Sequence, residues 1–474
     1  MSGTTQENDT TELPGGLTTQ VIATSSLGDR SYLATDGAIA VVVDPQRDVD
    51  RFLAAAGRLD VRITLVLETH VHNDYVSGGL ELARLTGAEY GIAADEEVAF
   101  EHRPLHHGET VELAPGMRVR AVSTPGHTYH HLSYVLEGER GPVGVFTGGS
   151  LLFGTTGRTD LVGREHTHQL AEHQHASARR LAESLPDGAR IWPTHGFGSF
   201  CSATRASGDS ATIGEQKETN PALTLAREEF VEKTLSGLDA YPAYYAHMGV
   251  RNAQGPEPID LRIPARATPA ELARRLDAGE WVVDLRTRKA YVDSHLAGTI
   301  SLGLDGPMAT WLGWMIDWGT PITLLAEDPA RITEAQRELA RIGIDRFAAS
   351  ATGRPEELAE DADRLRSTRT ATFVDLASAR TGEHERLPRA ETVLDVRTNN
   401  EWHASHVEGA THIPLYELGE RTEQLPKGVV WVHCGSGYRA AAAAALLERS
   451  GRTPVLIDDL FDNAEAAGVT LTPS

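Results

Sequence analysis

Short apolar runs separated by amphipathic stretches organise the first half of the chain. Residues 39–43, 63–67 and 143–146 are apolar runs with the length of buried strands, and stretches with helical periodicity lie between such runs. This alternation predicts a layered α/β domain over residues 17–254. Residues 1–16, by contrast, are polar and lack an apolar period, which predicts a disordered tail.

The pattern breaks at Gly255, Pro256 and Pro258 and then restarts. Thr-Pro-Ala-Glu at residues 268–271 has the form of a capping box with proline at the first helical position. A second domain is therefore predicted over residues 262–353.

An internal repeat occupies the remainder of the chain. Val-Asp-Leu-Arg at residues 283–286, with Ser-His at 294–295, recurs as Leu-Asp-Val-Arg at residues 394–397, with Ser-His at 405–406. The repeat predicts two sister domains. We place the second copy over residues 371–474 and expect an acidic linker between the copies.

Charge and cysteine content restrict the possible partners. The 474 residues include 44 Lys plus Arg against 67 Asp plus Glu, so the formal net charge is −23. Such a charge repels nucleic acid and anionic membranes, and no stretch has the pattern of a signal peptide or a membrane span. We expect a cytoplasmic protein that binds neither, with a homo-oligomer as a common state for soluble enzymes.

Two cysteines, Cys201 and Cys434, lie in segments of different character, so we expect free thiols.

The apolar run 63–67 leads into Thr-His-Val-His-Asn-Asp-Tyr at residues 69–75, the most informative segment of the chain. His70, His72 and Asp74 offer imidazole and carboxylate ligands from one short loop, as a bound metal ion requires. A predicted strand precedes the loop and a predicted helix follows it, so its position is well defined. The segment therefore predicts a metal site.

A second chemical motif begins where the apolar run 429–432 ends. His-Cys-Gly-Ser-Gly-Tyr-Arg at residues 433–439 precedes an alanine-rich helix, and Cys434 lies at the junction. Glycine amides, the helix N-terminus and Arg439 would stabilise an anion on the sulfur, so we expect a thiol that ionises readily. This pattern is typical of sulfur transfer through a cysteine persulfide. The residues expected to contact the substrate are Gly435, Ser436, Gly437 and Tyr438.

A buried structural cysteine and a phosphatase are the two other interpretations of this loop. Packing alone does not explain a cysteine beside two glycines, a hydroxyl and an arginine. Phosphatase loops of this kind hold a longer span than the four residues between Cys434 and Arg439. The loop and the repeated Asp-Val-Arg element resemble the rhodanese family, which implies a doubly wound α/β fold. The first copy has no cysteine between residues 261 and 363, so it resembles a degenerate member that packs against its neighbours or shapes a substrate path.

The first domain resembles the metallo-β-lactamase fold, in the branch of persulfide dioxygenases and glyoxalase II, which implies an αββα sandwich. The motifs behind this resemblance are residues 69–74, Thr-Pro-Gly-His-Thr at 124–128, Phe-Thr-Gly at 146–148, Gly-Arg-Thr-Asp at 157–160 and Pro-Thr-His-Gly at 193–196. They occur in the family's order and spacing.

Two positions depart from the family pattern. Tyr75 stands where the family has a histidine of its second metal site, and Gly149 stands where it has a carboxylate. A dinuclear hydrolase needs two ions bridged by that carboxylate to generate hydroxide. A glyoxalase II-like zinc thioester hydrolase is therefore the alternative rather than the leading function.

Persulfide dioxygenases use one Fe(II) bound by two histidines and one carboxylate. His70 and His127 match the two histidines. The third ligand is His72, Asp74, a water or nothing, and we favour His72, so that three imidazoles hold one Fe(II) or, alternatively, zinc. Asp74 and His195 then become weak ligands or partners that orient the imidazoles or a water.

Four further residues lie near these motifs. Cys201, six residues past His195 on a glycine-rich loop, is either a persulfide carrier that contacts the substrate or a buried small hydrophobe. Arg158 and Asp160 are expected to brace the site as an ion pair. The spacing of His131 does not distinguish a ligand from a solvated strand residue.

The two resemblances together imply a persulfide dioxygenase and sulfurtransferase fusion. Iron and O₂ would oxidise a low-molecular-weight thiol persulfide to sulfite. Cys434 would transfer sulfane sulfur to or from an acceptor such as sulfite, with thiosulfate as a product. Fusion raises the effective concentration of an intermediate passed between the sites. The alternatives are the zinc hydrolase and a metal-poor scaffold in which Cys434 performs all the chemistry.

Overall fold

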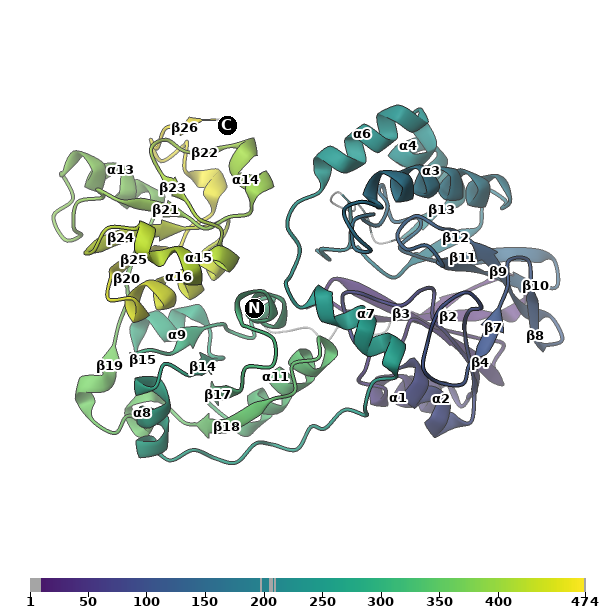
Figure 1. Cartoon of the computed structure of the whole chain (residues 1–474), viewed down its shortest axis with the longest axis horizontal. Coiled ribbons are helices and arrows are strands. Elements are labelled where there is room, and N and C mark those ends of the chain that lie inside the picture. The colour runs from purple at the N-terminus through teal and green to yellow at the C-terminus, as the bar shows by residue number, and fades with distance from the viewer. Residues whose placement is uncertain (1–9, 197, 204–207, 209, 473–474) are drawn as a thin grey trace. The chain divides into compact units, whose positions relative to one another are not determined.

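A computed structural model describes residues 10–196, 198–203, 208 and 210–472 (Figure 1). These residues form two compact units. The first unit comprises Met1–Ile259 with Ala340–Gly343, and the second comprises Asp260–Leu339 with Ile344–Ser474. The two repeated copies therefore belong to one unit.

Two β-sheets of described residues form the centre of the first unit. The first sheet, in the order β1-β2-β3-β4-β5-β6-β7, contains β1 (Thr10–Glu12), β2 (Thr18–Thr24), β3 (Asp29–Thr35), β4 (Ile39–Val43), β5 (Arg62–Leu67), β6 (Glu89–Ala93) and β7 (Arg103–Leu105). The second sheet, in the order β13-β12-β11-β10-β9-β8, contains β8 (Thr110–Ala114), β9 (Met117–Ser123), β10 (Leu132–Gly138), β11 (Gly141–Gly148), β12 (Arg190–Pro193) and β13 (Ala211–Thr212). The helices of this unit are α1 (Asp50–Leu59), α2 (Gly79–Thr86), α3 (Thr167–Glu183), α4 (Ile213–Thr219), α5 (Pro221–Thr224), α6 (Arg227–Gly237) and α7 (Tyr245–Gln254).

Apolar side chains on both faces of each sheet hold these layers together. Val41 and Val43 belong to the core between the sheets, whereas Val42 belongs to the core beneath α1 and α2, as the alternation of a strand requires. On the second sheet, Val145 packs in a core that includes Leu181 of α3 and residues of α6. Figure 1 shows helices on the outer face of each sheet. The predicted αββα sandwich is confirmed.

The beginning of the described chain differs from the predicted tail. Thr10–Glu12 forms β1 and pairs antiparallel with β2, and Leu13 is 7% exposed in the core between the sheets. A 3₁₀ turn, Pro14–Gly16, follows. The prediction was wrong for residues 10–16 because strand pairing and one buried leucine order a segment whose composition is polar. Residues 1–9 of the predicted tail lie outside the described residues.

Parallel strand pairs position the functional loops of this unit. β4 and β5 run parallel in the first sheet, and β11 and β12 run parallel in the second. Ligand sites in α/β proteins lie beyond the carboxyl ends of such strands. Asp44, His70, Gly149 and His195 all lie in the segments directly after these strand ends.

The second unit contains parallel sheets of the two copies. The first copy has the order β16-β14-β17-β18 and the second has the order β20-β25-β24-β21-β23, with the two-stranded pairs β15-β19 and β22-β26 beside them. The strands are β14 (Trp281–Asp284), β15 (His295–Leu296), β16 (Ile300–Ser301), β17 (Ile322–Ala326), β18 (Phe347–Thr352), β19 (Leu365–Arg366), β20 (Arg369–Ala371), β21 (Val393–Asp395), β22 (His406–Val407), β23 (Thr411–His412), β24 (Val429–His433), β25 (Thr453–Ile457) and β26 (Leu471–Thr472). The helices are α8 (Pro269–Asp277), α9 (Arg288–Asp293), α10 (Met308–Met315), α11 (Pro329–Arg341), α12 (Pro355–Leu358), α13 (Phe373–Thr381), α14 (Asn399–Ala404), α15 (Leu415–Arg421) and α16 (Tyr438–Arg449).

The repeated sequence motif makes the same contacts in both copies. The Arg286 guanidinium pairs with Asp284 at 2.6 Å and donates to the Ser294 carbonyl at 2.8 Å. In the second copy, Arg397 pairs with Asp395 at 2.6 Å and donates to the carbonyl of residue 405 at 2.6 Å. The repeat is therefore structural, since it ties the end of a central strand to the end of the next helix.

The segment predicted as an acidic linker belongs to the fold of the first copy. Leu358 is 3% exposed and packs in the same core as Val282 and Leu325. Further along, β19 pairs antiparallel with β15. The prediction was wrong because the acidic residues, such as Glu356 and Glu357, are exposed, while the leucine beside them is buried.

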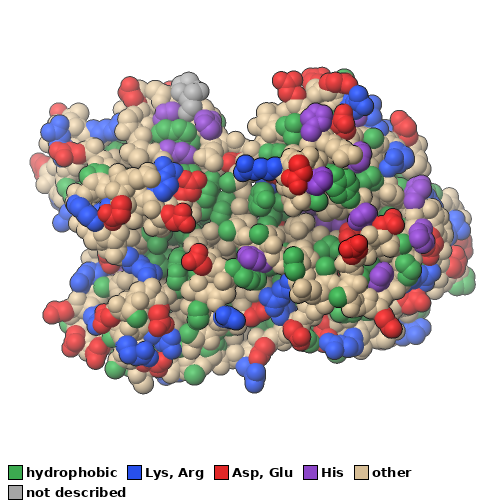
Figure 2. Space-filling model, viewed as in Figure 1, with side chains coloured by type: hydrophobic (Ala, Val, Ile, Leu, Met, Phe, Trp, Pro, Cys, Tyr) green, Lys and Arg blue, Asp and Glu red, His purple; other side chains and the backbone are tan. Residues whose placement is uncertain are grey.

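The surface carries charged side chains of both signs. On the face shown in Figure 2, Asp and Glu side chains are interspersed with Lys and Arg. Within the described ranges, no helix is both long enough and apolar enough to cross a membrane.

Candidate metal centre and cysteine loop

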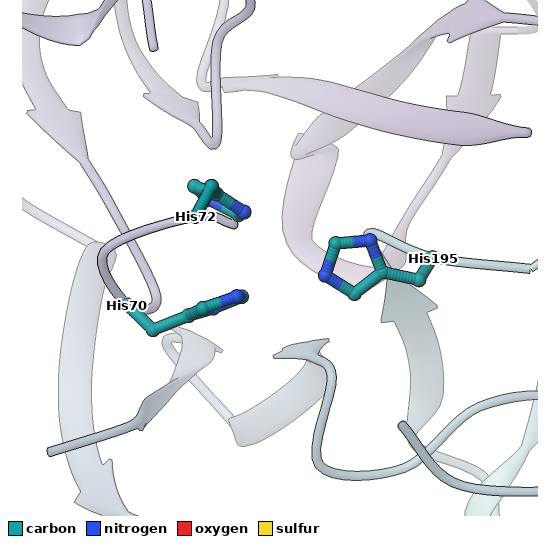
Figure 3. Close-up of side chains that lie close together, drawn as sticks. All are labelled: His70, His72 and His195. Atoms are coloured by element: carbon teal, nitrogen blue, oxygen red, sulfur yellow. The ribbon is translucent and has the colours of Figure 1, made fainter. Parts of the chain in front are cut away.

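Four histidines lie together at the carboxyl ends of strands in the first unit. His70 and His72 follow β5, His127 follows β9, and His195 follows β12. Each is at most 1% exposed. Ring centroids are 4.1 Å apart for His70 and His72, 4.8 Å for His70 and His127, and 5.2 Å for His127 and His195. Figure 3 shows His70, His72 and His195 around a common space.

Hydrogen bonds fix the tautomers of His70 and His127. The Thr69 hydroxyl donates to Asp44 at 2.8 Å, so its oxygen accepts from Nδ1–H of His70 at 2.9 Å. Nδ1–H of His127 donates to the Arg158 carbonyl at 2.7 Å. Both rings therefore present an unprotonated Nε2, as metal-binding histidines with oriented rings do.

Carboxylates hold the other two rings. Nδ1 of His195 lies 3.0 Å from Asp74 Oδ2 and 3.2 Å from Asp29 Oδ1. Burial by itself lowers the pKa of His195, but these two carboxylates outweigh it and raise that pKa to about 9. Burial, together with the charge of Asp74, raises the pKa of Asp29 to about 7.

His72 faces a second pair of acids. Its Nε2 lies 3.2 Å from Asp44, 3.1 Å from Glu68 and 2.9 Å from the Tyr75 hydroxyl. Burial alone lowers the pKa of His72, but Asp44 and Glu68 outweigh it and hold that pKa well above its ordinary value. Burial raises the pKa of Glu68 to about 7. These contacts direct Nδ1 of His72 toward the other rings.

His70 and His127 are neutral at ordinary pH. Burial, with the charge of His195 next, lowers the pKa of His127 to about 3. Burial and the neighbouring imidazoles, His72 first, hold the pKa of His70 well below its ordinary value. Neutral imidazole is the form that binds a metal ion.

The second ring nitrogen of each histidine has no hydrogen-bond partner in the part of the chain that the structure describes. These atoms are Nε2 of His70, Nδ1 of His72, Nε2 of His127 and Nε2 of His195. An unsatisfied buried polar atom costs about 1–3 kcal/mol, so such a group requires an explanation. Four buried nitrogens directed at one space fit a metal ion, since imidazole is a common ligand of iron and zinc.

The predicted metal residues occupy one cluster, with His195 closer to its centre than expected. Ligand atoms of His70, His72 and His195 lie within 4.8 Å of one another, and so do those of His127, His195 and Cys201. The sequence matched His70 and His127 to the family's two histidines, favoured His72 as the third ligand, and gave Asp74 and His195 supporting or weak-ligand roles. Asp74 Oδ2 contacts Nδ1 of His195, away from its free Nε2, and Asp74 Oδ1 lies 3.9 Å from Nδ1 of His72. Which histidines bind an ion stays a prediction.

Gly149 leaves no room for the family's carboxylate. A Cβ at this position would lie 2.3 Å from Cδ2 of His127, and one at Gly157 would lie 2.7 Å from Nδ1 of the same ring. The His127 ring therefore occupies the space between these two glycines. The Gly149 amide donates to His131 Nε2 at 3.0 Å, which also fixes the backbone.

Sequence reasoning missed several residues that support the cluster. His131 is fully buried, stacks on His70 at 5.0 Å between centroids and receives the Gly149 amide. Asp44 and Glu68 directly follow apolar strands, and a charged residue at such a strand end is a signal that would have indicated them. No sequence feature indicates Asp29, because it approaches His195 from a distant strand.

A cavity of about 400 Å³ is lined by residues adjacent in the chain to the site histidines. Val71 and Asn73, which alternate with His70 and His72, line it, and Thr128, next to His127, lines it as well. Further lining comes from aromatic side chains, Tyr129, Tyr241 and Tyr245. The cavity has the size of a small-molecule site, and its lining includes chain neighbours of three of the four histidines but none of the four themselves.

Cys201 lies at the same cluster and is fully buried. Burial holds the pKa of its thiol well above the ordinary value. Its carbonyl accepts from the Arg158 amide at 2.8 Å. Arg158 also forms the predicted ion pair with Asp160, with two contacts of 2.7 Å and 2.8 Å, and this pair braces the loop.

The cysteine loop of the second unit has the predicted position between β24 and α16. Cys434 is 1% exposed, and the Gly437 amide donates to its sulfur at 3.2 Å. Ser436 is exposed at the loop surface. The Gly435 carbonyl accepts from the amide of residue 461 at 3.0 Å, which anchors the loop.

Arg439 has a carboxylate partner that sequence reasoning did not identify. Its guanidinium binds both oxygens of Glu401, at 2.5 Å and 2.7 Å, and lies 5.4 Å from the Trp311 ring centroid. Burial by itself raises the pKa of Glu401. The Arg439 guanidinium outweighs burial and lowers that pKa to about 2. The pair holds the arginine beside the cysteine loop.

The first copy supplies part of the surroundings of this loop. The Tyr438 hydroxyl donates to the Gly303 carbonyl at 2.8 Å, and Arg288 pairs with Asp458 at 2.7 Å. At the position equivalent to the cysteine, the first copy continues from β17 with Ala-Glu-Asp. Its contribution is therefore to packing around the second copy.

Comparisons with known proteins agree with this arrangement. A family model described as Metallo-beta-lactamase superfamily matches residues 30–195, and one described as Rhodanese-like domain matches residues 380–460. The Hydroxyacylglutathione hydrolase-like protein of Mus musculus is 31% identical over 168 residues, which are 35% of this chain and 53% of that protein. The chain thus spans about half the length of this relative.

Two further relatives match more of the chain. Persulfide dioxygenase ETHE1, mitochondrial, of Homo sapiens is 28% identical over 244 residues, 50% of this chain and 80% of that protein. The crystal structure of a metallo-beta-lactamase from Staphylococcus aureus subsp. aureus COL is 26% identical with a TM-score of 0.63. The match covers 71% of this chain and 99% of that chain. This structural likeness extends beyond residues 30–195.

Proposed function

We propose that this chain, a metallo-beta-lactamase domain with persulfide dioxygenase homologues joined to a rhodanese-like domain, oxidises a low-molecular-weight thiol persulfide and transfers sulfane sulfur through Cys434. In the oxidation, persulfide, O₂ and water give thiol and sulfite, and O₂ is the oxidant. The resident metal in this proposal is one Fe(II), which supplies open coordination positions for O₂ and for the substrate sulfur when bound.

The observation that supports the oxidative half is the cluster of four buried imidazoles, each with one nitrogen that has no hydrogen-bond partner among the described residues. His70 and His127 would hold the ion through Nε2, because Thr69 and the Arg158 carbonyl fix the opposite nitrogens. A third imidazole, from His72 or His195, would complete the set. The aromatic side chains lining the cavity would limit the access of water to the bound persulfide.

In the transfer half, the Cys434 thiolate attacks the outer sulfur of a persulfide. A new S–S bond forms at Cys434, the donor's S–S bond breaks, and the donor thiolate leaves with the electron pair. Sulfite then attacks the outer sulfur, forms thiosulfate and returns the Cys434 thiolate, so no net oxidation occurs. The Gly437 amide, 3.2 Å from the sulfur, stabilises the anionic forms, and Arg439 adds positive charge beside the loop.

The zinc hydrolase is the second candidate, because relatives named hydroxyacylglutathione hydrolase match the chain. It needs a second ion, and the structure weakens that site at two positions. The Tyr75 hydroxyl lies 2.9 Å from His72 Nε2 and donates to the Asp44 carbonyl at 3.3 Å, away from the free nitrogens. Gly149 offers no bridging carboxylate.

Metal analysis and O₂ uptake test the proposal on the full chain. Protein prepared anaerobically with Fe(II) is expected to bind one equivalent and to consume O₂ with a thiol persulfide, releasing sulfite. His70→Ala should lose both metal and O₂ uptake, while Cys434→Ser should lose sulfur transfer and keep O₂ uptake. Two bound zinc ions with thioester hydrolysis would favour the hydrolase. If the protein binds no metal, sulfur transfer through Cys434 remains as its only activity.

A further inference from the structure

We propose that Cys201 is a thiolate ligand of the metal centre. This inference deepens the proposed function and rests on its metal centre, but not on iron or on O₂. On metal binding, the S–H bond breaks, a metal–sulfur bond forms and the proton leaves to water, with no change in oxidation state.

The ligand atoms of Cys201, His127 and His195 lie within 4.8 Å of one another, and both histidines have a free, buried Nε2. With zinc-type bond lengths, a tetrahedral site places nitrogen and sulfur ligands about 3.5 Å apart. The three atoms therefore need to move together by about an ångström to bind one ion, which is within the adjustment of side chains.

The site has no carboxylate at residue 149. A divalent ion held by imidazoles alone keeps its full charge inside a buried site, which is costly without an anionic ligand. No carboxylate fits at Gly149, because its Cβ would overlap the His127 ring. Asp74 lies against Nδ1 of His195, and its Oδ1 lies 3.9 Å from Nδ1 of His72. Cys201 is the anionic ligand that groups with His127 and His195, on the side of the cluster next to Gly149 and Gly157.

Backbone hydrogen bonds hold this cysteine in place. The Arg158 amide donates to the Cys201 carbonyl at 2.8 Å, and the Cys201 amide donates to Ser199 Oγ at 3.2 Å. The amide of Ala203 donates to the carbonyl of Thr156 at 2.9 Å. These bonds tie the cysteine segment to the segment whose Gly157 packs on His127. The sulfur and the His127 ring thus share one supporting framework.

The surroundings of the sulfur suit a metal ligand. Cys201 is 0% exposed and lies at the two histidines whose Nε2 atoms have no hydrogen-bond partner among the described residues. Burial and the charges of Asp74 and Asp29 hold the pKa of the free thiol well above its ordinary value, and Tyr245 and Arg158 oppose them in part. A bound metal ion would reverse this balance, because a thiol that coordinates a metal is deprotonated.

Cobalt substitution of the full-length protein tests the inference by absorbance rather than activity. Because the chain has two cysteines, Cys434→Ser is a matched control for Cys201→Ser. The wild type and Cys434→Ser are expected to bind Co(II) with an intense near-ultraviolet thiolate-to-Co(II) charge-transfer band. Cys201→Ser should lose the band and bind Co(II) at least about 10-fold more weakly in chelator competition.

The outcomes separate this inference from the proposed function. Co(II) binding by the wild type without a thiolate band would overturn the role of Cys201 and leave the metal centre intact. A wild type that binds no Co(II) would overturn both. Cys201→Ala serves as a second variant, and circular dichroism identifies any loss of fold. If both folded variants keep the band, the thiolate is not Cys201.

Discussion

Restoring the family's carboxylate by Gly149→Asp should damage the metal site rather than repair it. A Cβ at residue 149 would lie 2.3 Å from Cδ2 of His127, whereas ordinary carbon contacts are about 3.5–4.0 Å. The ring would have to move by about 1–2 Å. The space behind it is closed by Gly157, where a Cβ would lie 2.7 Å from the ring's Nδ1.

The magnitude follows from two costs. Overpacking a filled interior costs about 1–3 kcal/mol. Moving the ring also breaks the 2.7 Å bond from His127 Nδ1–H to the Arg158 carbonyl, and a buried polar group left without a partner costs about 1–3 kcal/mol. The sum is about 2–6 kcal/mol. At about 2–4 °C per kcal/mol for a domain of this size, the melting temperature of the first unit should fall by at least about 4 °C.

Differential scanning calorimetry of the metal-free full chain measures this shift. Gly149→Ala, which adds the Cβ without a carboxylate, should cause a similar fall and separates steric from charge effects. In the double variant Gly149→Asp/His127→Ala, the two effects on the melting temperature should not be additive. Removing the His127 ring removes its overlap with the new side chain. An unchanged melting temperature for Gly149→Asp, with tighter metal binding, would refute the reasoning.

Three further perturbations test other parts of the structure. Asp44→Asn should weaken metal binding by about 10–100-fold in chelator competition, because it removes a charge that orients His72; unchanged affinity would exclude that role. Arg439 lowers the pKa of Glu401 from 4.5 to about 2, so the pair stabilises the fold above about pH 4.5 and loses this contribution as the pH falls toward 2. Glu401→Gln should therefore flatten the acid dependence of urea midpoints for the second unit, and an identical dependence would contradict the pairing. Tyr438→Phe should lower the stability of that unit by about 1 kcal/mol in urea unfolding, since it removes the 2.8 Å bond to the first copy, and no change would show that the bond contributes nothing.

The arrangement around Gly149 shows how far sequence reasoning extends. The loss of a carboxylate is visible in the sequence, and it weakened the case for a dinuclear site. The sequence does not show that the His127 ring fills the vacated space, because the two residues come from different strand ends. Because of that contact, Gly149→Asp is expected to damage the metal site and not to repair it.

In the cysteine loop too, the local sequence indicated the position of the loop, whereas only the fold showed the partner of its arginine. Its position between an apolar strand and an alanine-rich helix is a local pattern, and β24 and α16 confirm it. The partner of Arg439 is Glu401, 38 positions earlier in the chain. Nothing in the local sequence of either residue indicates the other, so the pairing required the fold.

Local spacing alone therefore determined the order of the domains, the repeat, the two histidines of the first motif and the cysteine loop. Hydrophobic periodicity and short motifs depend on neighbouring residues, and these are fixed once the order of amino acids is given. Only the tertiary structure decided that His195 lies beside His70 and His72, that Asp29 and Asp44 orient their rings, and that the Cys201 sulfur reaches the same space. Those distances depend on how the ends of two sheets approach each other, and that approach is set by packing across the whole core.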